Sequence, residues 1–269
     1  MDSDEVVIEV FRRAALDRSR GASEIEETLI RGLLTLRPQW RGKALREGAN
    51  LLAELNPAMA NLRSLAERAG GGQLGELAAW LECRLGLLEE LPARLTANAW
   101  PRLIAAQRVV TLSRSASVAV VLEGAWKRGW PGSVVVLDGT ATGHGQDQAR
   151  RLAAAGEALS QPDASASHWL DGPGTVVLVG ADAVGSLRFV NAMGTRTLLE
   201  LARASGVDRV LIADTGKDVA ENAVDELLAS SLRHREGADR EWMVFEAVPI
   251  ELVTVRVSEV VRKAGREVC

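Results

Sequence analysis

Thr175-Val-Val-Leu-Val-Gly-Ala-Asp182 is the stretch that decides the fold. Its short run of apolar and β-branched residues, 175–179, predicts a strand buried on both faces, as the strands of parallel sheets are. The strand leads directly to Gly180, Ala181 and Asp182. Because a carboxylate at the exit of a buried strand is either paired or functional, Asp182 is the first candidate site residue.

A second polar segment, Asn191-Ala-Met-Gly-Thr195, begins nine residues after this carboxylate. We expect it to open a helix over 196–204, whose free N–H groups would then lie near the same edge of the sheet. Open α/β folds bind their ligands at that edge. Asn191, Gly194 and Thr195 are therefore candidate ligand-binding residues, and Gly194 would let the backbone approach a ligand closely.

From residue 108 onward, short Val, Leu and Ile runs alternate with helical segments. This alternation is typical of βαβ units and predicts a mainly parallel, doubly wound sheet whose strand ends meet at one edge. The segment 159–174, rich in Ser, Asp, Ala and Pro, is predicted to be a loop. The expected strands are 109–112, 133–137, 175–179, 209–213 and 243–245, and the expected helices are 118–128, 147–155, 196–204 and 220–230.

The first hundred residues have a different pattern. Residues 3–98 show helix periodicity and few β-branched runs, which indicates a helical region. Ser23 and Glu26 are interpreted as a capping box in front of an apolar stripe. We therefore expect an α/β protein with a helical domain over 1–100 and a Rossmann-like domain over 101–269.

Composition argues against several classes of function. The chain has 36 acidic and 32 basic side chains and a net charge of −4, so no direct binding to nucleic acid is expected. No apolar run approaches the roughly 18 residues of a membrane span, and the acidic start does not resemble a signal peptide, so we expect a cytoplasmic protein without a membrane partner. His144, His168 and His234 share no ligand spacing, and neither a metal nor another cofactor is predicted.

Ser113-Arg-Ser-Ala-Ser117 lies between a predicted strand and a predicted helix. Hydroxyls, a guanidinium and free N–H groups at a helix start make an anion site, for which phosphate is the expected ligand. Alternatively, Ser115 or Ser117 caps the helix and Arg114 is solvated. Lys217, after the fourth predicted strand, either points toward the same edge of the sheet or is a solvated loop lysine.

Four motifs, in order along the chain, resemble those of one superfamily. Val179–Asp182 with Val190–Thr195 resembles the signature VGAD…VNKIGT. Gly21–Glu24 is similar to an early helix start, Asn56–Leu62 to the segment RPSMAPL, and Phe245–Leu252 to a closing F…TP.ELI. This superfamily unites the regulatory (α, β and δ) subunits of eukaryotic translation initiation factor 2B with methylthioribose-1-phosphate and ribose-1,5-bisphosphate isomerases.

The resemblance implies a phosphorylated small molecule, a sugar phosphate or a nucleotide, as the ligand, and a homodimer formed through the α/β domain. It also implies that the 113–117 loop lies at the ligand site. Asp182 matches the catalytic aspartate of the isomerases, and Asn191 resembles a ligand-binding asparagine. The alternative interpretation, which the absence of the isomerases' cysteine favours, is that Asp182 caps or pairs with neighbouring N–H groups.

The chain departs from the isomerase pattern in three places. Ser113 stands where the isomerases carry a catalytic cysteine, and an alcohol is much harder to ionise than a thiol with its free pKa of about 8.5. Ala192 replaces the lysine that follows the asparagine, and 138–145 lacks the arginine that grips the sugar phosphate. Arg114 and Lys217 are the candidates to replace the lost positive charge.

These departures favour a binding function. We predict an initiation factor 2B-like protein that binds a phosphorylated sugar or nucleotide at the carboxyl edge of its sheet, without isomerase activity. The alternative is an aldose–ketose isomerase acting on a ribose 1-phosphate-type substrate, with Asp182 as the acid/base.

Overall fold

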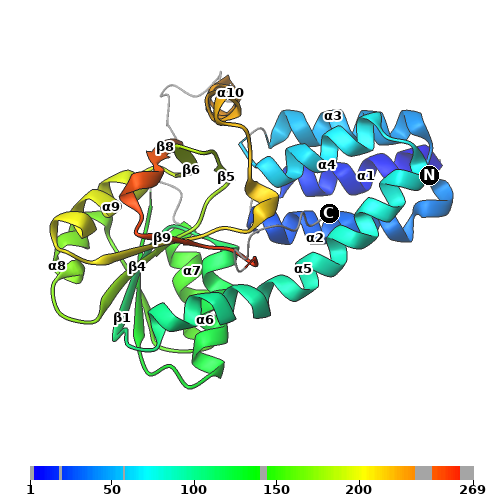
Figure 1. Cartoon of the computed structure of the whole chain (residues 1–269). Coiled ribbons are helices and arrows are strands. Elements are labelled where there is room, and N and C mark those ends of the chain that lie inside the picture. The colour runs from blue at the N-terminus through cyan, green and yellow to red at the C-terminus, as the bar shows by residue number, and fades with distance from the viewer. Residues whose placement is uncertain (1–2, 18–19, 57, 140–143, 234–243, 261–269) are drawn as a thin grey trace.

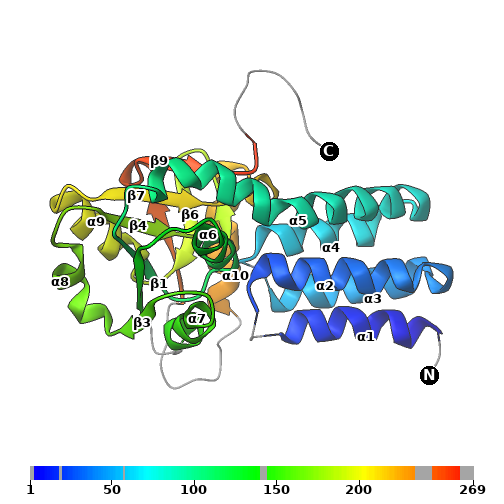
Figure 2. The ribbon, with the colours of Figure 1, turned by 90° about the horizontal axis from the view of Figure 1, so that it is seen from below.

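The computed structural model describes residues 3–17, 20–56, 58–139, 144–233 and 244–260. A bundle of helices lies at one end of the molecule and an α/β part at the other (Figures 1 and 2). The predicted fold class, a helical amino-terminal region followed by a mainly parallel Rossmann-like sheet, is therefore confirmed.

The helical part is held together by a continuous apolar core that contains Phe11, Ile25, Leu45 and Leu62, all fully buried. That core continues into the α/β part, so the two parts share a packed boundary. The elements are α1 (Ser3–Leu16), α2 (Ala22–Thr35), the short 3-10 helix η1 (Arg37–Gln39), α3 (Gly42–Leu55), α4 (Ala60–Gly71) and α5 (Leu74–Leu103).

Helix α5 connects the two parts. It is 30 residues long and runs from the bundle to the α/β part (Figure 2). The predicted domain boundary at residue 100 falls within its last turn, and that division of the chain stays a prediction.

The predicted capping box is wrong because α2 begins earlier than expected. Gly21 is the N-cap, and its N–H donates to the Glu24 carboxylate at 3.0 Å. Ser23 and Glu26 thus lie inside the helix. Ser23 Oγ is buried without a hydrogen-bond partner, and the Glu26 carboxylate binds Arg84 instead.

The parallel sheet has the strand order of a Rossmann fold. Its strands lie in the order β3-β2-β1-β4-β7-β9, and every neighbouring pair is parallel. The order reverses between β1 and β4, and ligands of such sheets bind outside the strand ends at this point. The strands are β1 (Arg108–Leu112), β2 (Ser133–Leu137), β3 (Ala158–Gln161), β4 (Thr175–Val179), β7 (Asp208–Ile212) and β9 (Val255–Val257).

Helices cover both faces of this sheet. Val109 and Val134 belong to the core beneath α5, α6 and α7, whereas their neighbours Val110 and Val135 belong to the core beneath α8 and α9. This alternation between faces follows from the two-residue period of a strand. The helices are α6 (Ala116–Lys127), α7 (His144–Ala153), α8 (Ala166–Leu170), α9 (Thr195–Ala204) and α10 (Glu221–Arg233), with 3-10 helices η3 (Asp163–Ser165), η4 (Thr215–Lys217) and η5 (Ile250–Leu252).

A second, antiparallel sheet was not predicted. It has the order β5-β6-β8, with β5 (Ala183–Val184), β6 (Arg188–Ala192) and β8 (Phe245–Pro249).

Three corrections to the predicted elements follow. Asn191 lies within β6, which pairs with β8 across the sequence, and the expected helix begins after it, at Thr195 with Gly194 as the N-cap. The last predicted strand, of which Met243 lies outside the described residues, joins this second sheet as β8, and β9 completes the parallel one. β3 occupies part of the predicted loop, because an edge strand with half-buried residues carries little apolar signal.

Among the described residues, the structure contains no helix that is both long and apolar enough to cross a membrane.

Candidate functional site

Loops from three strands converge at the carboxyl edge of the parallel sheet. They follow β1 (113–117), β4 (180–182) and β7 (214–217). A Cβ atom added at Gly180 would lie 2.2 Å from Ser115 Oγ, and Lys217 Nζ lies 3.4 Å from Ser117 Oγ. The loops therefore touch at the point where the strand order reverses.

Ser113 has a left-handed backbone, with φ at 57°, and is buried. A positive φ is uncommon outside glycine, and such backbone conformations cluster at functional sites. Its N–H donates to the Leu137 carbonyl at 2.9 Å, which ties the first loop to the end of β2. A Cβ added at Gly139 would lie 2.6 Å from Ser113 Cβ. The next residues, 140–143, belong to the segment 138–145 that lacks the arginine of the isomerases, and they lie outside the described residues.

Ser115 and Arg114 have structural partners. Ser115 Oγ accepts a hydrogen bond from Val118 N at 3.3 Å and so caps α6, the alternative considered for this loop. The half-buried Arg114 donates to the Arg20 carbonyl at 3.4 Å. The first loop thus lies against the amino-terminal helices as well as against the sheet.

Lys217 brings a positive charge to this edge. Its side chain is only 5% exposed, and its ammonium donates to Ser117 Oγ, which is also buried. Dehydrated charges require compensation, and one hydroxyl supplies only part of it. The charge of Lys217 acts on the Asp182 carboxyl, whose pKa it lowers.

Asp182 is held in place by hydrogen bonds of its backbone, and its side chain is half-buried. Its N–H donates to Val190 O at 2.8 Å, and its carbonyl accepts from Ala60 N at 3.1 Å, at the start of α4. Dehydration by the surrounding protein raises the pKa of the carboxyl from 3.8 to about 6, while the nearby Lys217 ammonium lowers it. A carboxyl with this pKa exchanges its proton close to neutral pH.

The segment around Asn191 lies next to this edge, but its side chains bind one another. Asn191 Nδ2 donates to Thr195 Oγ1 at 2.9 Å, and Thr195 Oγ1 donates to Ala192 O at 2.6 Å. Both side chains are buried, so the turn before α9 uses their polar atoms. Gly194 is the N-cap of α9 with φ at 99°, and a Cβ there would lie 3.3 Å from Leu112 at the end of β1.

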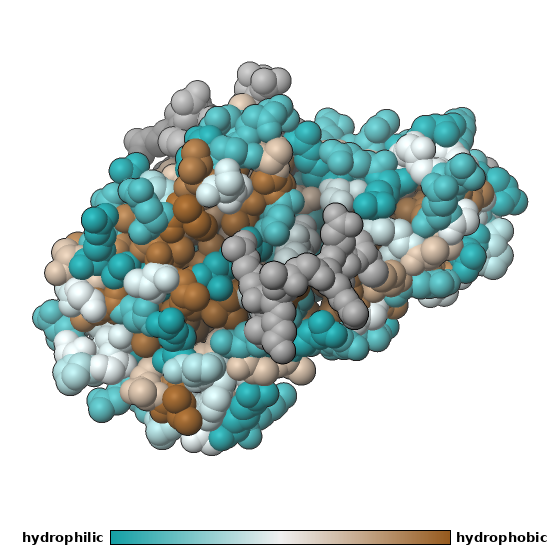
Figure 3. Space-filling view, in the orientation of Figure 1, coloured by the Kyte–Doolittle hydropathy of each residue, from teal (hydrophilic) through white to brown (hydrophobic). Residues whose placement is uncertain are grey.

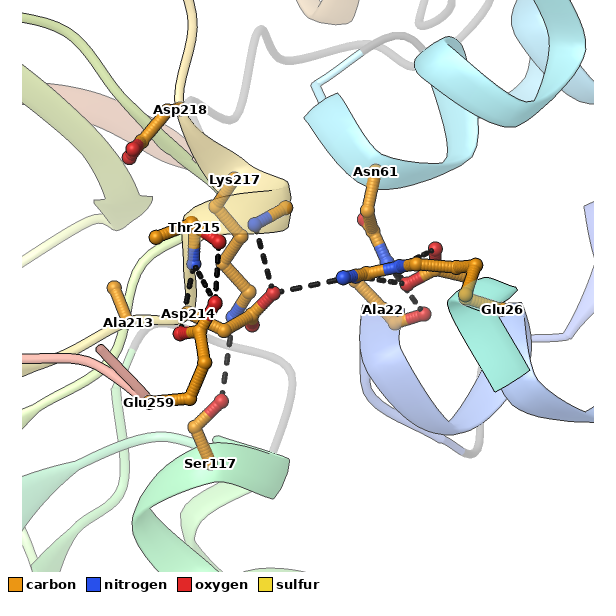
Figure 4. Close-up of polar contacts among 12 residues, drawn as sticks. Ala22, Glu26, Asn61, Ser117, Ala213, Asp214, Thr215, Lys217, Asp218 and Glu259 are labelled. Carbon is orange, nitrogen blue, oxygen red and sulfur yellow. Dashed lines mark hydrogen bonds and ion pairs between the residues drawn. The ribbon is translucent and has the colours of Figure 1, made fainter. Parts of the chain in front are cut away.

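A buried charge network next to Lys217 was missed by the sequence analysis (Figure 4). The Arg84 guanidinium donates to both Glu26 oxygens, at 2.7 and 2.9 Å, and to Asp214 Oδ1 at 3.2 Å. Asn61 Nδ2 donates to Glu26 Oε2 at 2.8 Å. The network joins α2, α4 and α5 to the residue that follows β7.

The sequence offered one signal that points to a charge at this sheet edge. Asp214 follows β7 as Asp182 follows β4, so the same rule would have selected it. Glu26 was assigned to a helix cap, and Arg84 lies in an ordinary helical pattern. A cavity of about 440 Å³ borders the network, between α4 and α5 on one side and η4 and α10 on the other.

The apolar surface of the α/β part is visible in Figure 3. Brown side chains gather where Figure 1 shows β6, β8 and β9, whereas the helical part presents mainly hydrophilic side chains in this view.

Comparisons with known proteins agree on the fold. Residues 90–260 match the model of the initiation factor 2 subunit family. The chain is similar to the translation initiation factor eIF-2B of Pyrococcus horikoshii OT3, with 20% identity, 94% coverage of each chain and a TM-score of 0.77. No curated protein sequence matches the chain significantly.

Two further solved structures are similar at lower scores. For the tetrameric eIF2B-beta2-delta2 complex from C. thermophilum the identity is 18%, the coverage 95% of this chain and 91% of that one, and the TM-score 0.74. For 5-methylthioribose 1-phosphate isomerase from Pyrococcus horikoshii OT3 the identity is 18%, the coverage 94% and 83%, and the TM-score 0.66.

The raised pKa of Asp182 predicts how stability depends on pH. The folded state binds the proton of the Asp182 carboxyl more tightly than the unfolded state does. The stability that this proton contributes is therefore lost as the pH rises through about 6. Asp182→Asn removes the ionisation. Relative to the wild type, the variant should gain about 1–3 kcal/mol in free energy of unfolding between pH 4 and pH 7.5, measured by urea denaturation.

Asp171→Asn is the matched control, because it removes the same formal charge from an exposed position. If the two variants show the same pH dependence, the Asp182 carboxyl is not dehydrated in solution.

Proposed function

The chain belongs to the initiation factor 2 subunit family, and we propose that it binds a phosphorylated sugar or nucleotide at the carboxyl edge of its parallel sheet without isomerising it. The observation that carries this proposal is the buried Lys217 ammonium, which donates to Ser117 Oγ near the point where the strand order reverses and whose charge lowers the pKa of Asp182. A phosphate placed there would complete the compensation of that charge.

The first loop supports an anion at the same place. Ser115 is the N-cap of α6 and Ser117 lies in its first turn, and free N–H groups of a helix start attract phosphate. Ser113 lies at the beginning of this loop with its unusual backbone conformation. We assign phosphate contacts to Lys217, Ser113 and the start of α6, and assign Asn191 and Thr195 to the support of the neighbouring turn.

Lys217 is also the candidate replacement for the lysine that follows the asparagine in the isomerases. Ala192 stands at that position, at the end of β6 in the antiparallel sheet. Lys217 comes instead from η4, after β7, and its ammonium is buried against Ser117 at the sheet edge. The positive charge is thus supplied from another strand end.

Binding to this site is tested by calorimetry with ribose 1,5-bisphosphate, methylthioribose 1-phosphate and AMP. Lys217→Met should weaken binding about 10- to 100-fold, because a hydrogen bond to a charged group contributes about 1.5–3 kcal/mol. Lys127→Met, at the exposed end of α6, changes the net charge equally and should leave affinity unchanged. Equal affinities in both variants would place the ligand elsewhere.

Isomerase activity is the second candidate, and the pKa of Asp182 favours it. A carboxyl that titrates at about 6 is suited to general acid–base catalysis near neutral pH. The serine at position 113 argues against it, because no thiol is available to exchange a proton. The aspartate alone does not complete the pair of groups that the reaction uses in the isomerases.

A coupled assay for ketose formation distinguishes the two candidates. We expect no conversion of ribose 1,5-bisphosphate or methylthioribose 1-phosphate by the wild type. Ser113→Cys, assayed beside it, restores the family thiol, and activity in this variant alone would identify a pocket that lacks only the thiol. Turnover by the wild type would contradict the binding function and favour the isomerase.

We further propose a cytoplasmic homodimer formed through the α/β part. The apolar surface in the region of β6, β8 and β9 supports it, as does Leu187, which is 66% exposed in the turn between β5 and β6. Sedimentation velocity at micromolar concentration should give a species of twice the chain mass, and Leu187→Asp should weaken it. A monomer at that concentration would exclude this dimer.

A further inference from the structure

Arg84 reaches from the helical part to the strand end that carries Lys217. It is buried, and both oxygens of Glu26 hold its guanidinium in place. The close approach depends on Gly216, since a Cβ there would lie 2.2 Å from Arg84 Nη2. The sequence of η4 therefore leaves room for this guanidinium against its backbone.

Asp214 receives this contact and also shapes η4. Its Oδ1 accepts from Gly216 N at 3.1 Å and from Arg84, and its carbonyl accepts from Lys217 N at 3.2 Å. Its second oxygen, Oδ2, is buried and has no hydrogen-bond partner. A buried carboxylate in this state attracts any cation within reach.

Lys217 is such a cation, because it lies in the same short turn on a flexible side chain. Nevertheless, its ammonium donates to Ser117, and among the described residues no ion pair joins it to Asp214 (Figure 4). The charge on Asp214 is already compensated by Arg84. Acidic and basic groups thus alternate from the helical part to the site: Glu26, Arg84, Asp214, Lys217 and Asp182.

We propose that Arg84 is a positioning residue for the phosphate site. Arg84 reaches across the boundary between the two parts and pairs with the Asp214 carboxylate. Because Asp214 is already paired, the Lys217 ammonium stays directed at Ser117 and the sheet edge. This inference rests on the proposed function, since Lys217 is the residue through which Arg84 acts. Without Arg84, the ammonium turns to Asp214 and the phosphate loses its cation. Correct packing of the helical part then becomes a condition for ligand binding.

The test uses a matched pair of variants that differ only at position 214. Glu26→Gln with Arg84→Met removes the guanidinium without leaving Glu26 unpaired, and the third substitution Asp214→Asn then neutralises the competing carboxylate. Asparagine also caps helices well, so η4 should keep its start. Lys217→Met is the reference for complete loss of the cation.

Two quantities are measured for each variant: the affinity for ribose 1,5-bisphosphate, by calorimetry, and the pKa of Asp182, by carboxyl NMR. The double variant should lose about tenfold in affinity and show a raised Asp182 pKa, as Lys217→Met does, because the ammonium that lowers this pKa has moved away. The triple variant should recover both values. A merely structural role for Arg84 predicts no recovery, since the triple variant lacks the guanidinium as well.

The charge at position 214 could also change the Asp182 pKa directly, without Lys217. To separate this direct effect from the one that acts through Lys217, the comparison of the double and triple variants is repeated with Lys217→Met added to both. There, Asp214→Asn should change neither measurement. Persistence of its effect without Lys217, or an unchanged Asp182 pKa in the double variant, would overturn the inference. If the wild type binds none of the ligands, the proposed function fails, while the pKa measurements still decide the role of Arg84.

Discussion

The pairing of Arg84 with Glu26 and Asp214 is the interaction on which the arrangement of the two parts depends. One guanidinium binds a carboxylate from α2 and another that follows β7, and all three side chains are buried. Dehydrating such charges costs about as much as their attraction returns, so the network contributes little net stability. Losing one partner is costly, because unpaired charges remain in the interior. The network therefore selects one relative placement of the parts, the one in which Asp214 meets Arg84.

The elements predicted from the sequence are those whose burial is evident from their own residues. β1, β2, β4 and β7 are continuous apolar runs between polar ends, which is how a strand covered on both faces appears in a sequence. β3 lies at the edge with every residue half-buried, so its apolar signal is weak. β6 forms because β8, more than fifty residues later, pairs with it. The strand propensity of the β6 residues alone does not indicate such a distant partner.

The same distinction holds for the site. Ser113, Asp182 and Lys217 were selected as candidates because topology brings the carboxyl ends of parallel strands together, whatever the loops contain. Arg84 was not found, since its partners lie 58 and 130 residues away in the chain. Asn191 and Thr195 were selected by their place in a motif. Their hydrogen bonds with each other follow from a tight turn between β6 and α9 that the motif alone does not reveal.

In the proposed phosphate site, a buried ammonium and a half-buried carboxyl would together restrict how the ligand binds. Lys217 attracts the anion, but the ionised form of Asp182 repels it at short range, where the low local dielectric strengthens both interactions. The repulsion is relieved if Asp182 keeps its proton. Because its pKa is raised to about 6, protonation near neutral pH costs little free energy. A protonated carboxyl then donates a hydrogen bond to a phosphate or sugar oxygen. In an isomerase this proton would move during the reaction. Under the proposed binding function, in which position 113 offers no thiol to complete the exchange, the same proton would hold the ligand instead.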